Sequence, residues 1–73
     1  MTKLPRVSGR QCVSVLLRLG FVLKRQHGSH MILRRESPFA QVVVPDHGEL
    51  DTGTLRAILR QAGVSPEEFI KLI

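Results

Sequence analysis

Hydrophobic residues recur at helical spacing in two stretches of the chain. In the first, Gly9 to Leu19, an apolar face opposes polar residues that follow one another at four-residue steps. Ser8 before this stretch is a typical N-cap, and Gly20 after it is a typical helix stop. In the second stretch, the core positions i, i+3, i+4 and i+7 are occupied by Leu55, Ile58, Leu59 and Ala62. We therefore predict two amphipathic helices, the second capped by Asp51 or Thr52 and closed by Gly63.

Three short runs between these helices have the composition of β-strands. They are residues 21–26, 30–34 and 41–44, rich in β-branched and other strand-forming residues. Residues 27–29 have turn chemistry, and Pro38 interrupts the pattern over residues 36–40 because it cannot donate to a strand ladder. Phe39 in that interruption is either exposed or folded back onto the core. Two short connections between three strands predict an antiparallel meander.

A final capping box, Ser65 to Glu68, with proline at its first helical position, opens a short C-terminal helix. Residues 1–73 are thus expected to form a single α+β domain of the order α-β-β-β-α. Both long helices should pack on one face of the three-stranded antiparallel sheet, which leaves the other face bare. This is also the element order of double-stranded-RNA-binding domains.

Composition and charge narrow the possible functions. The chain has 73 residues and one cysteine, Cys12, so an internal disulfide is excluded and Cys12 alone cannot make a zinc site. No apolar run approaches a membrane span or a secretory signal, so we expect a cytoplasmic protein. The net charge of +5 combines eight basic and no acidic residues in 1–35 with three basic and six acidic residues in 36–73. A basic half of this kind attracts polyanions, with nucleic acid ahead of an anionic membrane surface.

The histidines are the main candidates for chemistry. If Met31 and Leu33 point into the core, a period of two places His30, Ile32 and Arg34 on the bare face. An imidazole there, near the cations of Lys24, Arg25 and Arg34, could remove the 2′-hydroxyl proton of RNA and leave a 2′,3′-cyclic phosphate. The alternative is a surface histidine without a role. A metal site built from His27, His30, Cys12 and His47 is disfavoured, because the H-x-x-H spacing converges only on a helix.

Three segments of the chain resemble the HicA (YcfA-like) toxins of prokaryotic type II toxin–antitoxin systems. They are Arg25-Gln26-His27-Gly28-Ser29-His30, the strand end Val43-Val44-Pro45-x-His47, and Gly53 to Gly63, in order and over most of the chain. The resemblance implies a double-stranded-RNA-binding-like fold and ribosome-independent cleavage of mRNA. It implies one catalytic histidine, which by position is His30, flanked by Gly28 and Ser29.

The resemblance further implies neutralisation by a HicB-type antitoxin and neither a metal nor an organic cofactor. Together with the charge pattern, it gives His30 as general acid/base and Lys24, Arg25, Gly28, Ser29 and Arg34 as RNA-binding residues. No contact with DNA or membrane is expected of the chain alone. Two other interpretations stay open: a non-catalytic RNA-binding module of the same fold, and a domain that contacts only a partner protein.

Overall fold

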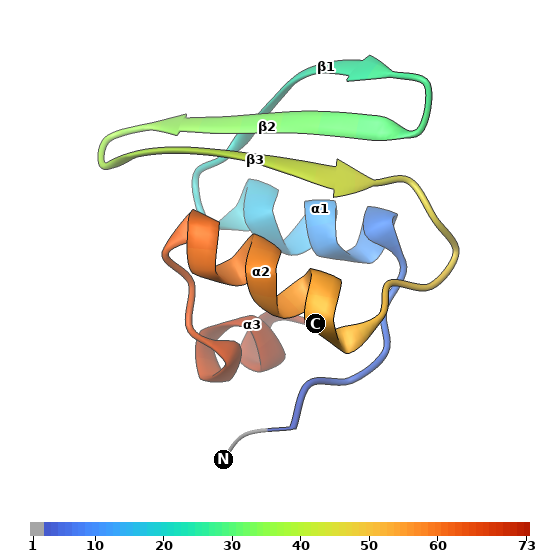
Figure 1. Cartoon of the computed structure of the whole chain (residues 1–73). Helices are drawn as coiled ribbons and strands as arrows, with labels where there is room; N and C mark the ends of the chain where they lie inside the picture. Colours follow the sequence, from blue (N-terminus) through green and yellow to red (C-terminus); the bar gives the residue numbers. More distant parts are fainter. Residues whose placement is uncertain (1–2) are drawn as a thin grey trace.

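The structure is a computed structural model that describes residues 3–73; residues 1 and 2 of the predicted domain lie outside the described residues. Its elements are α1 (Gly9–Arg18), β1 (Val22–His27), β2 (His30–Glu36), β3 (Phe39–Pro45), α2 (Thr52–Ala62) and α3 (Pro66–Leu72). The strands form one antiparallel sheet in the order β1-β2-β3, and α1 and α2 lie on the same side of it (Figure 1). The predicted α+β fold is confirmed.

Each helix begins at the cap that its local sequence encodes. Ser8 accepts a hydrogen bond from the Gln11 amide at 3.0 Å, and the Gln11 side chain accepts one from the Ser8 amide at 2.8 Å. Asp51, rather than Thr52, caps α2, because its carboxylate accepts a 2.7 Å hydrogen bond from the Thr54 amide. The predicted capping box at the start of α3 is confirmed.

The second hairpin is tighter than the sequence predicts. The pairing of β2 with β3 continues to Glu36 opposite Phe39, so only Ser37 and Pro38 form the turn. The prediction that the sheet is interrupted over residues 36–40 was therefore wrong. Pro38 does not break the ladder, since a residue inside the turn needs no ladder N–H. Phe39, with 67% of its surface exposed, does not fold back onto the core.

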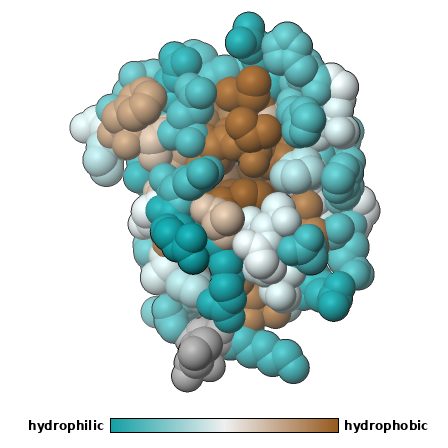
Figure 2. Space-filling model, viewed as in Figure 1, coloured by the Kyte–Doolittle hydropathy of each residue, from teal (hydrophilic) through white to brown (hydrophobic). Residues whose placement is uncertain are grey.

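One hydrophobic core fills the space between the sheet and the helices. The sheet contributes alternate residues, Met31, Leu33, Ala40, Val42 and Val44, and the helices contribute Cys12, Leu16 and the predicted stripe of α2. Phe21 and Phe69 are buried, as expected. On the surface seen in Figure 2, hydrophobic residues gather in the upper part of the molecule and are bordered by hydrophilic ones. Within residues 3–73, no helix is long and apolar enough to cross a membrane.

The other face of the sheet is open. On it lie His30, Ile32 and Arg34, because they alternate with the buried Met31 and Leu33 as the sequence predicts. All six residues of β1, the edge strand at the top of the sheet in Figure 1, are exposed. The register of β1 shifts between Leu23 and Arg25, so Lys24 is an extra residue in a β-bulge.

Candidate active site

The candidate site is the hairpin turn between β1 and β2. Only Gly28 and Ser29 form the turn, and Gly28 has a φ of +55°, a conformation that glycine adopts without steric cost. The turn was predicted to include His27, but β1 continues through His27, which pairs directly with His30. All four of these residues are exposed. The sharp turn therefore presents two imidazoles at one end of the open sheet face.

Asp46, the residue after β3, fixes the position of this turn. Its backbone amide donates a 2.6 Å hydrogen bond to the Ser29 carbonyl oxygen. Its carboxylate accepts two hydrogen bonds of 3.1 Å from Arg10 of α1 and one of 3.2 Å from Gln26 Nε2. The same Gln26 nitrogen donates to the Gly28 carbonyl oxygen at 2.9 Å. A helix, a strand and the turn are thus all held by Asp46, the turn through its backbone amide and the helix and the strand through its carboxylate.

The charges within this cluster stabilise one another. The hydrogen bond from Arg10 lowers the pKa of the Asp46 carboxyl, and the hydrogen bond from Gln26 lowers it further. The carboxylate therefore stays ionised to a lower pH than a free aspartate does. The side chain of Asp46 is only 20% exposed, whereas that of Arg10 is 76% exposed, so the carboxylate lies largely beneath its partner.

The first turn of α1 lies directly against the chain segment that carries Asp46. The Gly9 amide donates a 2.9 Å hydrogen bond to the His47 carbonyl oxygen. A side chain at position 9 would overlap with the Pro45 carbonyl group, so only glycine allows this close approach. The position of α1 is therefore coupled, through Pro45 to His47, to the position of the turn.

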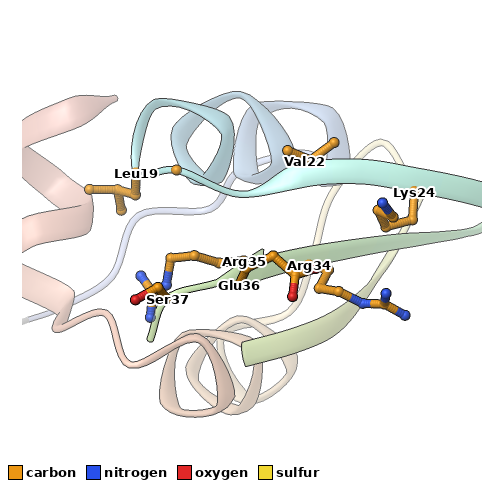
Figure 3. Close-up of a pocket in the computed structure, with 8 residues that line it drawn as sticks. Leu19, Val22, Lys24, Arg34, Arg35, Glu36 and Ser37 are labelled. Carbon is orange, nitrogen blue, oxygen red and sulfur yellow. The ribbon is translucent and has the colours of Figure 1, made fainter. Parts of the chain in front are cut away.

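The predicted RNA-binding cations fall into two groups. Arg25 lies opposite Ile32 on the open face and is a diagonal neighbour of His30 across the two strands. Arg34 lies four residues beyond His30, about 13 Å along β2 at roughly 3.3 Å per residue. Lys24 and Arg34 line one open pocket of about 390 Å³ together with Glu36, and Figure 3 shows them on neighbouring strands. Arg34 donates to Gln41 at 3.0 Å.

Arg35 and Cys12 lie in surroundings that point to a structural role rather than a catalytic one. Arg35 packs over the Phe21 ring at 4.7 Å and donates to the carbonyl oxygens of Pro38 and Ala62, so it ties the sheet to the end of α2. Burial raises the pKa of the Cys12 thiol to about 11, which is the opposite of nucleophile activation. Among the described residues, no three His, Cys, Asp or Glu side chains lie close enough together to hold a metal ion.

The sequence prediction named Gly28, Ser29, His30 and Arg25, which the structure brings together. It did not find the roles of Asp46 and Arg10. These two residues are 36 positions apart, so no local spacing signals their contact. Only the strand pairing, which returns β3 to the side of the first turn of α1, places them together.

A comparison with protein families identifies the family to which most of the chain corresponds. The family model described as the HicA toxin of bacterial toxin–antitoxin systems matches residues 9–64. The match begins at the first residue of α1, continues through the hairpin turn and Asp46, and ends just after α2. No protein among the curated sequences matches significantly.

Proposed function

Because the chain belongs to the HicA family of toxins from bacterial toxin–antitoxin systems, we propose that it is a metal-independent endoribonuclease that cleaves mRNA without the ribosome. His30 acts as the catalytic general acid/base. The observation that carries this proposal is the exposed His30 imidazole, which a two-residue turn presents on an open sheet face beside Arg25.

The reaction follows from what an imidazole can do next to RNA. A neutral His30 accepts the proton of a 2′-hydroxyl, and the 2′-oxygen then attacks the adjacent phosphorus. The bond from phosphorus to the 5′-oxygen breaks and that oxygen takes up a proton, which leaves a 2′,3′-cyclic phosphate on one fragment and a 5′-hydroxyl on the other. Arg25, one strand away, stabilises the negative charge that develops on the phosphoryl oxygens.

Substrate binding relies on charge rather than on base stacking. The chain has no Trp or Tyr and only three Phe, two of which are buried. Lys24, Arg25 and Arg34 provide phosphate contacts along the open face, and the exposed amide-rich turn at Gly28 and Ser29 lies beside the scissile phosphate. A HicB-type antitoxin blocks the toxin by covering this surface.

The test compares wild type, His30→Ala and His47→Ala in cells that lack an antitoxin. His47 is the matched control, since it is also an exposed histidine but lies outside the hairpin. We expect His30→Ala alone to abolish growth arrest and mRNA cleavage, and the purified wild type to cleave RNA in EDTA. Equal toxicity of wild type and His30→Ala would refute the role of His30. RNA binding without cleavage by the wild type would instead indicate a non-catalytic binding module.

A further inference from the structure

His27 and His30 form a cross-strand pair at the end of the open sheet face. We propose that His27 is a second catalytic residue of this site, which donates a proton to the leaving 5′-oxygen while His30 removes the 2′-hydroxyl proton. This inference rests on the proposed ribonuclease function.

The geometry of the hairpin carries the proposal. His30 alternates with the buried Met31 and therefore points to the open face, and its direct partner His27 shares that face. Directly opposed residues have Cβ atoms about 4.5–5.5 Å apart, which lets two imidazoles flank a phosphate. Both histidines are exposed, and neither makes a side-chain hydrogen bond within residues 3–73. Their nitrogens are thus available to a substrate.

The chemistry requires two proton transfers at two places. One proton leaves the 2′-hydroxyl as the new bond to phosphorus forms, and another must reach the 5′-oxygen as its bond to phosphorus breaks. The attacking and leaving oxygens lie roughly in line on opposite sides of phosphorus, so one imidazole does not reach both at once. After cleavage His30 is protonated and His27 is neutral, and proton exchange with water restores the starting forms.

Charged groups on three elements and the loop after β3 surround the pair. Arg25 on β1 and Arg34 on β2 lie on the open face with the pair, and Lys24 follows at the bulge of β1. On the other side of the turn, Asp46 is already paired with Arg10 of α1 and with Gln26, and His47 follows in the same loop. The Asp46 carboxylate is thus engaged by partners other than the two histidines.

The first experiment measures single-turnover cleavage of an RNA oligonucleotide against pH. We expect a bell-shaped rate profile for the wild type. We expect His27→Ala to lower the rate roughly 10²–10⁴-fold and to remove the fall at alkaline pH. We expect an unchanged melting temperature, and His47→Ala should behave as wild type. A His27→Ala rate within about threefold of the wild-type rate would overturn the proposal, since general acid catalysis contributes far more.

The second experiment separates proton donation from a structural effect. The same oligonucleotide is prepared with a bridging sulfur in place of the 5′-oxygen at the cleaved position, because a thiolate leaves without receiving a proton. His27→Ala should then cleave nearly as fast as wild type, whereas His30→Ala should stay inactive. Equal loss on both substrates would overturn the role of His27 as acid. If the wild type bound but did not cleave the unmodified RNA, the proposed function itself would fail, so the two failures are distinguishable.

Discussion

Replacement of Gly9 by alanine tests how closely α1 approaches the segment after β3. The added Cβ would overlap with the Pro45 carbonyl oxygen and lie 2.9 Å from the Pro45 carbonyl carbon and 3.3 Å from the Asp46 Cα. These atoms belong to backbone, so relief requires α1 or the Pro45–Asp46 segment to move. The movement also weakens the 2.9 Å hydrogen bond from the Gly9 amide to the His47 carbonyl oxygen.

Two opposing effects set the size of the change. Alanine has a helix propensity better than that of glycine by about 1 kcal/mol. Steric overlap in a packed interior costs about 1–3 kcal/mol, and the weakened hydrogen bond costs about 1 kcal/mol more. We therefore expect Gly9→Ala to lower the free energy of unfolding by about 2 kcal/mol, the overlap outweighing the propensity. In a domain of this size, that corresponds to a melting temperature lower by about 10 °C.

The assay is thermal unfolding followed by circular dichroism, with urea unfolding as a second measure. Gly48→Ala is the matched control, because nothing lies within 4 Å of a Cβ added there, and surface changes of this kind stay within about 0.5 kcal/mol. A Gly9→Ala protein as stable as wild type would refute the close approach. If Gly48→Ala lost as much stability as Gly9→Ala, steric overlap would not be the cause of the loss at position 9.

Three further predictions follow from the caps, the carboxylates and the core. Ser8→Ala removes the N-cap of α1 and should lower the free energy of unfolding by about 1 kcal/mol in urea titrations, whereas Ser14→Ala, exposed mid-helix, should not. The pKa of Asp51 is lowered by its hydrogen bonds from Thr54, so its stabilisation is present above the unfolded value of about 4 and lost as pH falls below it; Asp51→Asn should flatten this acid dependence of the melting temperature. Cys12 should resist a thiol reagent at pH 8 until the protein is unfolded, since burial raises its pKa to about 11; rapid stoichiometric labelling of the native protein would contradict this.

The helices were predictable because their signals are local. The caps Ser8 and Ser65 lie within four residues of the groups they bind, and the stripe of α2 follows from spacing alone. The strand ends were less predictable. Pro38 suggested an interruption where the sheet continues on both sides of a two-residue turn, since its position in the turn depends on strand register rather than on composition.

In the candidate site too, the features set by local sequence were predictable and those set by strand pairing were not. A period of two within β2 suffices to place His30 on the open face, and that prediction is confirmed. His27 was assigned to the turn because His-Gly-Ser has turn chemistry throughout, and only the observed pairing moves it into β1 opposite His30. The contact of Asp46 with Arg10 joins residues from distant parts of the chain, so no sequence window contains both.

The bulge at Lys24 also affects how separate molecules meet. A regular edge strand offers unpaired backbone groups to the edge strand of another molecule, which leads to polymerisation. In β1 the extra residue interrupts the ladder and increases the local twist. Two copies that approached along this edge would also bring Lys24 and Arg25 of each strand toward like charges. The irregular, cationic edge therefore disfavours sheet extension between molecules while the adjacent face stays open to a polyanion.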